Sequence, residues 1–255
     1  MKKTLLIIFF LLIVPVVAAA VWLLSIRANS DALWKIVSQQ CVPNQQQRHD
    51  PAPCLEVALD KHVVVFKDAK GPLHTLLMPT EKITGIESPA VQQPDAPNFF
   101  YYAWQARDRL KQMADKPISD RYLGLAINSW YGRSQNQLHI HLACLRPDVY
   151  QTLSQREPHI GSRWQPLGEK LKGHDYLAMK IPANAFAQQS PFALLNAYVE
   201  QHGDDIAKYG LAVTMTGQGE FVLLANRLDI TDLNLGTAGE ILDYDCALQK
   251  EIASR

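Results

Sequence analysis

The stretch QLHIHLACL, residues 137–145, alternates apolar side chains with polar or small ones. A period of two is typical of a β-strand, in which successive side chains point to opposite sides of the sheet. One side carries the apolar side chains that can enter a core: Leu138, Ile140 and Leu142. The other side carries the polar and small residues: Gln137, His139, His141 and Ala143. The pattern therefore predicts two imidazoles next to each other on one face of a sheet.

The segments around this strand predict a sheet of antiparallel neighbours. RYLGLAINS reads as the preceding strand, and WYGRSQN supplies the connecting loop. HVVVFKDAKGPLHTLLM holds two strand-like runs on either side of the turn residues DAKG, which is typical of a hairpin. Further strands are expected at 173–182, 209–216 and 220–227, and helices at 31–40, 98–114, 146–156 and 190–202. Because these elements are mixed without strict alternation, we expect an α+β fold with an antiparallel sheet and flanking helices.

The composition limits the classes of protein that fit this chain. It has 255 residues, a formal net charge of zero and no visible repeat period. A protein that holds nucleic acid mainly by basic attraction carries a clear positive excess, so no nucleic-acid partner is expected. The length suits one sizeable domain or two small ones.

The N-terminus, MKKTLLIIFFLLIVPVVAAAVWLLS, predicts a membrane anchor over residues 1–25. Residues 5–24 carry no charge, and a helix of this length spans about 30 Å, the thickness of the hydrocarbon core. Lys2 and Lys3 precede this run, so the N-terminus is expected in the cytoplasm and the rest outside. In a bacterium, this places the chain at the inner membrane, facing the periplasm. The alanine run at 18–20 leaves cleavage of a signal peptide open as an alternative.

The four cysteines lie in the part of the chain that is predicted to be outside the cytoplasm, where disulfides persist. Residues 26–60 read as a linker helix and a polar cysteine loop, which a disulfide between Cys41 and Cys54 would close. Cys144 with Cys246 is a second candidate pair, and two buried free thiols are the simpler alternative for them. No C-x-x-C pair is present, so no zinc site is expected.

Three interpretations of the histidine pair stay open on the residues alone. The first is structural, with both imidazoles hydrogen-bonded on a solvated strand face. The second is a metal site, for which His74, His174 or a carboxylate would supply a further ligand. The third is nucleophilic catalysis, in which one imidazole nitrogen attacks phosphorus and a neighbour binds the phosphoryl oxygens.

The motif QLHIHLA resembles that of the histidine-triad hydrolases, which carry H-φ-H-φ-H-φ-φ on a strand, where φ is apolar. In this alignment Gln137 stands in the place of the first histidine, His139 in that of the nucleophile, and His141 in that of the phosphate contact. The other register makes His141 the nucleophile and leaves Ala143 in third place. We favour the first register because a glutamine can still donate and accept hydrogen bonds.

A second segment, VVVFKDAKGPLHTLLMPTEKI, has the family's order of strand, polar turn, histidine, strand and proline. His74 falls on the upstream active-site histidine of the family, and Asp68 falls on the region that meets the nucleotide ribose. The resemblance also implies Asn128 and Ser134 as polar contacts to the phosphate or the nucleophile. Arg146, which follows the histidine strand, is a further candidate for a phosphate contact.

Together with the predicted anchor, nearly the whole chain resembles the bacterial CDP-diacylglycerol pyrophosphatases. The matching motifs include GPLHTLLMPT, PNFFYYAWQARD and GRSQNQLHIHLACLRPDV. The resemblance implies a histidine-triad-like hydrolase domain over residues 61–255, which cleaves CDP-diacylglycerol with water to CMP and phosphatidate. It implies a nucleotidyl-histidine intermediate and no metal or other cofactor. The implied partners are the lipid substrate and the inner membrane.

Two alternatives of other kinds stay open. One is a metal-dependent phosphohydrolase that uses the same histidines. The other is an inactive envelope module that binds a lipid or a nucleotide. Gln137 keeps the second alternative open, because it replaces a titratable side chain of the family pattern.

Overall fold

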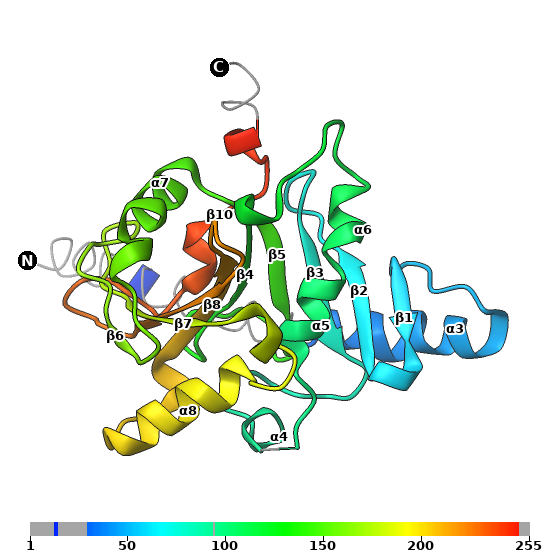
Figure 1. The fold of residues 1–255 in the computed structure, drawn as a ribbon. Coiled ribbons are helices and arrows are strands. Elements are labelled where there is room, and N and C mark those ends of the chain that lie inside the picture. The colour runs from blue at the N-terminus through cyan, green and yellow to red at the C-terminus, as the bar shows by residue number, and fades with distance from the viewer. Residues whose placement is uncertain (1–12, 15–29, 94, 250–255) are drawn as a thin grey trace, which may run out of the picture.

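A computed structural model of the chain describes residues 13–14, 30–93 and 95–249. Within these residues the chain forms one ten-stranded sheet, in which all paired strands are antiparallel. The strand order is β1-β2-β3-β5-β4-β8-β9-β7-β6, and β10 pairs in addition with β5 (Figure 1). The strands have these bounds: β1 Glu56–Ala58, β2 Val63–Lys67, β3 Thr75–Pro79, β4 Leu123–Ile127, β5 Ile140–Leu145, β6 Gln165–Pro166, β7 Leu177–Ile181, β8 Tyr209–Met215, β9 Phe221–Arg227 and β10 Leu242–Asp243. The antiparallel sheet with flanking helices confirms the predicted α+β fold.

The helices mostly begin and end near the residues that the sequence indicated. Helix α5 begins after Asn98, whose side-chain oxygen accepts a hydrogen bond of 3.1 Å from the backbone N–H of Tyr101. This bond satisfies a donor that the first turn of a helix leaves unpaired. The helices have these bounds: α2 Ala32–Ile36, α3 Val42–Arg48, α4 Pro89–Gln92, α5 Phe99–Gln105, α6 Arg107–Lys111, α7 Pro147–Arg156 and α8 Pro191–Gln201. A π-helical turn over Val37–Cys41 joins α2 to α3, and a 3-10 turn, η7, spans Ala238–Ile241.

One face of the sheet is covered by α5, α6 and α8. These helices contribute large apolar side chains to the main core, among them Phe100, Leu110 and Phe192. The apolar side chains of the predicted histidine strand enter the same core: Leu138, Ile140 and Leu142. Their burial leaves the residues between them to the opposite face, as the period of two requires.

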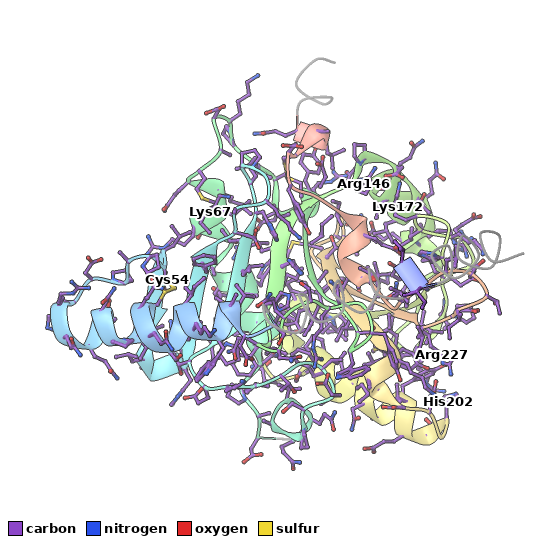
Figure 2. All side chains as sticks on the ribbon, turned by 180° about the vertical axis from the view of Figure 1, so that it is seen from behind. Cys54, Lys67, Arg146, Lys172, His202 and Arg227 are labelled. Atoms are coloured by element: carbon purple, nitrogen blue, oxygen red, sulfur yellow. A yellow bond between two sulfur atoms is a disulfide. The ribbon has the colours of Figure 1, made fainter. Side chains whose placement is uncertain are left out.

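The opposite face of the sheet carries two separate apolar clusters. Over β1 to β3, Leu33 and Val37 of the α2–α3 rod pack against Leu76, and Figure 2 shows this rod from behind. The other cluster lies under α7 and η7 and contains Ala126. His141 pairs with Leu76 on one neighbouring strand and with Ala126 on the other. Because cross-strand neighbours share a face, His141 lies between the two clusters.

Residues 30–60 are built into the sheet domain, whereas the sequence assigned them to a linker helix and a loop. The helix continues past Gln40 to Arg48, and β1 adds a strand to the edge of the sheet. Pro43 lies in the first turn of α3, where the missing N–H of proline is tolerated, so the chain stays helical there. The apolar side of this rod then packs on the sheet instead of standing in solvent.

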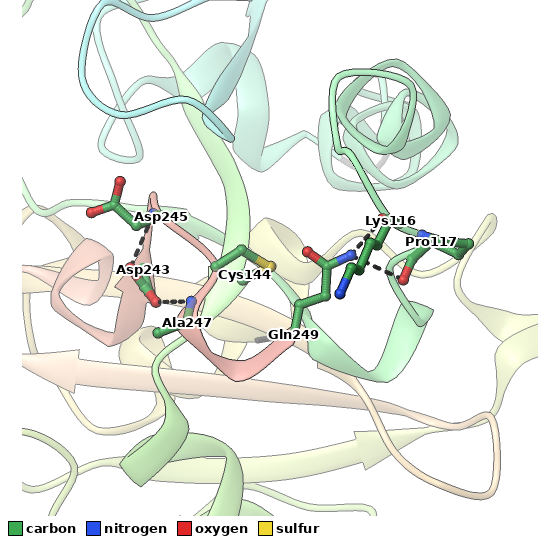
Figure 3. The surroundings of a disulfide bond; sticks show 8 residues. Lys116, Pro117, Cys144, Asp243, Asp245, Ala247 and Gln249 are labelled. Carbon is green, nitrogen blue, oxygen red and sulfur yellow. Dashed lines mark hydrogen bonds between the residues drawn. A yellow bond between two sulfur atoms is a disulfide. The ribbon is translucent and has the colours of Figure 1, made fainter. Parts of the chain in front are cut away.

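The four cysteines, all within the described part of the chain, form two disulfides. One joins Cys41 to Cys54, which closes the segment that the sequence indicated. The other joins Cys144 to Cys246, 102 residues further along, where two free thiols were the simpler expectation. Figure 3 shows how this second disulfide holds the segment after β10 against β5. Asp243 caps that segment, since its carboxylate accepts bonds of 3.0 and 2.7 Å from the N–H groups of residues 245 and 247.

The sheet consists of two similar halves. The order β3-β5-β4 on one side of the centre recurs as β7-β9-β8 on the other, with β4 and β8 side by side. GLAI in β4 and GLAV in β8 are paired so that Ala126 lies opposite Ala212. A local two-fold axis through this pair relates His141, which pairs with Ala126, to Leu224, which pairs with Ala212. This repeat rests on strand order and register, so it gave no visible period in the sequence.

The predicted anchor over residues 1–25 lies almost entirely outside the described residues. In the ranges 13–14, 30–93 and 95–249, no helix combines the length and the apolar character that crossing a bilayer requires. From Ser30 onward the chain is described without a break up to residue 93. The carbonyl oxygen of Ser30 accepts a hydrogen bond of 2.6 Å from the N–H of Asn136.

Candidate active site

Three imidazoles meet on the face between the two apolar clusters. His141 lies on β5, His139 lies just before that strand, and His74 directly precedes β3. The β3–β5 register puts Leu76 opposite His141 and thereby brings His74 to the same place. The ring centroids of His139 and His141 are 4.9 Å apart, and those of His74 and His141 are 5.1 Å apart. Both imidazoles of the H-x-H pair therefore lie on one side of the sheet.

Backbone groups fix which nitrogen of His74 carries a proton. Its Nδ1 lies 3.2 Å from the carbonyl oxygen of Lys70, which can only accept, so Nδ1 is the donor. Asp68 supports the same tautomer, since its Oδ1 lies 3.9 Å from Nδ1 and accepts a bond of 2.8 Å from the N–H of Lys70. The Nε2 of His74 then accepts from Nδ1–H of His141 at 2.9 Å. His141 is left with a bare lone pair on its Nε2.

His139 is held in the same tautomer by a different backbone group. Its Nδ1 donates to the carbonyl oxygen of Gln137 over 2.7 Å, which leaves the lone pair on Nε2. Its ring stands nearly perpendicular to that of His141, at 80°. The side chain is 7% exposed, so the ring is largely withdrawn from water. The site therefore presents two imidazole lone pairs, one from each histidine of the pair.

Burial keeps all three imidazoles neutral near pH 7. It lowers the pKa of His74 to about 4, with the charge of Asp68 opposing part of that effect. It also lowers the pKa of His139, against the hydrogen bond to Gln137. The pKa of His141 lies well below its usual range, because burial is joined by the repulsion of a proton on either neighbouring histidine. Neutral imidazole is the form that can act as nucleophile or base.

The sequence gave no indication of Tyr244, which covers His74. The two rings are stacked at 6°, with 3.8 Å between their centroids. The carbonyl oxygen of Tyr244 accepts a bond of 2.9 Å from the N–H of Leu73, and the disulfide to Cys144 follows two residues later at Cys246. Tyr244 thus excludes water from His74 and belongs to the segment that is cross-linked to the histidine strand.

Asn128 and Gly239 lie on the far side of His141 from His74. The side-chain oxygen of Asn128 accepts a bond of 2.9 Å from the N–H of Gly239, across 111 residues of sequence. A Cβ on Gly239 would lie 3.2 Å from that oxygen and 3.8 Å from Cδ2 of His141. The amide of Asn128 and the ring of His141 therefore border one small region, which fits a polar contact from Asn128 to the substrate.

Gln137 holds the backbone and does not offer a donor to the site. Its Nε2 donates to the carbonyl oxygens of Pro79 and Glu81, at 3.0 and 2.9 Å. Its Oε1 is buried and finds no hydrogen-bond partner among the described residues. The sequence indicated this amide as a donor to the substrate, but both of its N–H groups are occupied by carbonyl oxygens at and after the end of β3. Gln137 still acts on the site, since its carbonyl oxygen orients His139.

One of the predicted substrate contacts, Arg146, lies away from the imidazoles. Ser134 is exposed in the loop between β4 and β5. Arg146 directly precedes α7, at the far end of β5 from His141, about 17 Å along the strand. It lies beside Lys172 (Figure 2), and both side chains contact the carboxylate of Asp148, at 3.6 and 2.9 Å. The structure therefore groups His74, Asp68 and Asn128 with the H-x-H pair, but not Arg146, and the role of Ser134 stays a prediction.

In the described residues, no three His, Cys, Asp or Glu side chains are arranged to hold a metal ion. His174, which the sequence offered as a further ligand, instead contacts the carboxylate of Glu240 at 2.9 Å.

Comparison with solved structures shows a protein with a similar fold. The chain resembles a DUF4931 family protein from Bacillus cereus ATCC 10987, with a TM-score of 0.50 and 11% identity over 79% of this chain and 98% of that chain. At this identity the likeness shows the α+β fold alone. The family model described as CDP-diacylglycerol pyrophosphatase matches residues 28–250. The chain therefore belongs to the CDP-diacylglycerol pyrophosphatase family, which is a family of hydrolases that act on CDP-diacylglycerol.

Proposed function

We propose that this chain is a membrane-anchored hydrolase that cleaves CDP-diacylglycerol to CMP and phosphatidate, with His139 as the nucleophile. The observation that carries the proposal is the bond of 2.7 Å from Nδ1–H of His139 to the carbonyl oxygen of Gln137. This bond leaves the Nε2 lone pair free for attack on phosphorus. Attack converts His139 into an imidazolium, and the carbonyl oxygen of Gln137 is then a fixed acceptor for the proton on its Nδ1.

The reaction proceeds in two displacements. In the first, Nε2 of His139 forms a bond to the phosphorus of the CMP moiety, and the bond from that phosphorus to the bridging oxygen breaks. Phosphatidate leaves with the bonding electrons. Its phosphate has a second pKa of about 6, so departure needs no strong acid. In the second displacement, water attacks the same phosphorus, the N–P bond breaks, and CMP leaves with one oxygen from water.

His141 has a different role in this proposal. Its Nδ1–H is bound to Nε2 of His74, so in the neutral state it offers a lone pair to the site and no donor. It is therefore suited to accept the proton of the attacking water, and it can donate to a phosphoryl oxygen once it holds that proton. In this proposal the amide of Asn128, which borders the same region as the ring of His141, donates to a phosphoryl oxygen throughout the reaction.

The membrane location is part of the same proposal. The uncharged run at 5–24 and the lysines before it support an anchor in the inner membrane with the catalytic domain in the periplasm. The two disulfides support a compartment outside the cytoplasm. An anchor is useful for this substrate, since each CH₂ of a buried acyl chain contributes about 0.8 kcal/mol to its retention in the bilayer.

Replacement of His139 by Ala tests the nucleophile. Release of CMP from CDP-diacylglycerol should fall by at least about a thousandfold, since the covalent route is removed. His202→Ala is the matched control, because His202 is exposed at the end of α8 (Figure 2) and should leave turnover unchanged. Turnover by wild-type protein should also persist in EDTA. Near wild-type release by His139→Ala, or loss of all activity in EDTA that returns with zinc or manganese, would reject the histidine nucleophile.

A further inference from the structure

We infer that the surface of the lipid bilayer docks on an exposed apolar patch beside the histidines. The patch is formed by five side chains on two loops: Trp130, Tyr131, Ile230, Leu233 and Leu235. Leu233 is 84% exposed, Ile230 75% and Trp130 53%, although side chains of this kind are normally buried. Gathered apolar side chains on a surface mark an interaction site. The choice of a bilayer as the partner rests on the proposed function, whose substrate is a membrane lipid.

The two loops form a single unit through Ser129, which is fully buried. Its N–H donates to the carbonyl oxygen of Gly236 at 2.9 Å, and its hydroxyl donates to the carbonyl oxygen of Leu235. The hydroxyl oxygen also accepts from the N–H groups of Tyr131 and Gly132, at 3.1 and 3.0 Å. The loop after β4 and the loop after β9 are therefore tied together, and their apolar side chains belong to one surface.

The tip of the second loop satisfies its own backbone. Asp229 and Asn234 exchange two N–H to carbonyl bonds of 2.8 Å, and the N–H of Leu233 donates to the carbonyl oxygen of Ile230 at 3.3 Å. The side chain of Asp229 accepts from both the N–H and the hydroxyl of Thr231. A loop that enters the edge of a bilayer must pair its polar groups internally, because lipid offers them no partners. This tip meets that condition to a large extent.

The composition of the patch fits the interface between head groups and acyl chains. Trp and Tyr are enriched at that depth, because an amphipathic ring can lie partly in lipid and partly in water. Ile230 and Leu233 at the tip can enter by the roughly 5–10 Å that is typical of interfacial segments. The carboxylate of Asp232 lies 2.9 Å from Nζ of Lys170, which reduces the cost of bringing it close to the head groups.

The patch continues directly into the site. Trp130 follows Asn128 by two residues, and Leu235 precedes Gly239 by four. Asn128 and Gly239 are bonded to each other and border the ring of His141. A lipid whose acyl chains remain in the bilayer under the patch would thus have its diphosphate close to the imidazoles.

The first residues described after the predicted anchor contact the same loop. The carbonyl oxygen of Ser30 is bonded to the N–H of Asn136, and the N–H of Leu33 donates to the side chain of Gln135 at 3.1 Å. Ser30 follows the end of the uncharged run, at residue 24, by six residues. Ser30, the first residue described after the predicted anchor, therefore contacts the loop that also carries Trp130 and Tyr131 of the patch.

The test uses the full chain in lipid vesicles and two forms of the substrate. One is CDP-diacylglycerol with long acyl chains in the vesicles, and the other is a short-chain analogue that is dissolved as a monomer. Ile230→Asp/Leu233→Asp should lower turnover of the vesicle substrate at least tenfold and leave that of the dissolved analogue within twofold of wild type. Leu59→Asp is the matched control, because Leu59 is 40% exposed in the 3-10 turn between β1 and β2 and should change neither.

Equal loss with both substrates, or no loss with either, would overturn the docking site. A second measurement does not depend on catalysis. The fluorescence of Trp130 is obtained as the difference between wild type and Trp130→Phe. Lipids with brominated acyl chains should quench this fluorescence. If that fluorescence is not quenched, or if Ile230→Asp/Leu233→Asp converts a dimer into a monomer, the patch does not bind lipid. Failure of wild type to cleave either substrate would reject the proposed function alone, since the quenching still reports on docking.

Discussion

Each imidazole of the site is hydrogen-bonded to a different partner, and this partner determines which ring nitrogen carries the proton. His139 is bound to a backbone carbonyl oxygen, His141 to another imidazole, and His74 to a carbonyl oxygen near a carboxylate. None of these partners compensates for the loss of water around the rings, so all three pKa values are lowered.

The pH dependence of activity follows from those directions. The reaction needs neutral imidazoles, and kcat/KM reports the groups of the free enzyme. We expect kcat/KM to stay level as the pH falls through the ordinary histidine pKa of about 6.5, and to decline only nearer the lowered values. The measurement is a pH series with CDP-diacylglycerol in detergent micelles. An acid limb centred at or above that ordinary value would contradict the neutral, buried site.

The same burial makes folding depend on pH. His74 titrates at about 6.5 when unfolded and at about 4 when folded, so between these values the unfolded chain binds more protons. The contribution of His74 to the free energy of unfolding is therefore fully present above about pH 6.5. It is lost as the pH falls toward about 4, by about 1.4 kcal/mol per pH unit. Urea unfolding across this range should show the slope. His74→Gln should show a smaller slope, and an equal slope would contradict the assignment.

Gln137 acts on the site through the backbone. Gln137→Met keeps the approximate volume but removes both donors to the carbonyl oxygens of Pro79 and Glu81. We expect a loss of stability of about 1–3 kcal/mol, because two acceptors lose their partners in a buried place. The loss of kcat should be less than tenfold, since the carbonyl oxygen that orients His139 remains. A fall in kcat as large as that of His139→Ala would instead assign Gln137 to the chemistry.

At the scale of the elements, the segment after β10 completes the site. It puts Tyr244 on His74, and the disulfide from Cys246 to Cys144 ties it to β5. Cys246→Ser should lower kcat by about tenfold and move the acid limb of the pH profile upward, because water reaches His74 when Tyr244 is displaced. Tyr244→Ala should have the same two effects, and Tyr244→Phe should have neither.

Cys54→Ser is the control for that prediction. It breaks the disulfide to Cys41, which closes a separation of 13 residues at the edge of the sheet. Both replacements lower the free energy of unfolding. We expect about 3 kcal/mol for Cys54→Ser, which opens a short loop, and about 5 kcal/mol for Cys246→Ser, which opens a loop of about 100 residues. Activity is therefore compared at a temperature at which circular dichroism shows both variants folded. Equal effects of Cys54→Ser and Cys246→Ser on kcat would refute a specific role of the Tyr244 segment.

The sequence predicted those parts of the site that rest on local pattern. The period of two around His139 and His141 indicated their shared side, and the family resemblance assigned His74 to the same site, next to which the β3–β5 pairing brings it. Tyr244 and Gly239 could not be found, because they reach the site through tertiary contacts across a hundred residues or more, which no local pattern records.

Two local predictions differ from the structure for identifiable reasons. The cysteine segment was predicted as a loop because it is polar, but residues 42–48 are helical, with Pro43 in the first turn of α3, where a proline is tolerated. Gln137 was expected to face the substrate as the first member of the motif. Its amide instead found two backbone acceptors at the end of β3, and that competition depends on how two strands meet.

At the scale of the whole molecule, the two halves of the sheet differ in chemistry. The local two-fold axis puts Leu224 in the place of His141 and Val222 in that of His139. Both apolar side chains are buried in the cluster under α7 and η7. The second half therefore contributes neighbouring strands, part of the apolar cluster under α7 and η7, and the loop after β9 that carries part of the patch. It has no imidazole at the position equivalent to His141.

This asymmetry predicts one nucleotidyl adduct per chain. Protein mixed with excess CDP-diacylglycerol and denatured within one turnover should gain the mass of a single CMP moiety through an N–P bond. Acid should release it, since phosphorus–nitrogen bonds to imidazole are labile to acid, and His139→Ala should not form it. Two adducts on one chain, or one that persists in His139→Ala, would show a second nucleophile.

The ring of Tyr244 has a consequence for biosynthesis. A ribosome delivers His74, His139 and His141 well before it delivers the residue that shields the first of them. Until Tyr244 emerges and Cys246 finds Cys144, the nascent chain holds an uncovered imidazole cluster. The histidines are therefore made first and their cover last, and a product that stops short of residue 244 should fold much of the sheet and remain a poor catalyst.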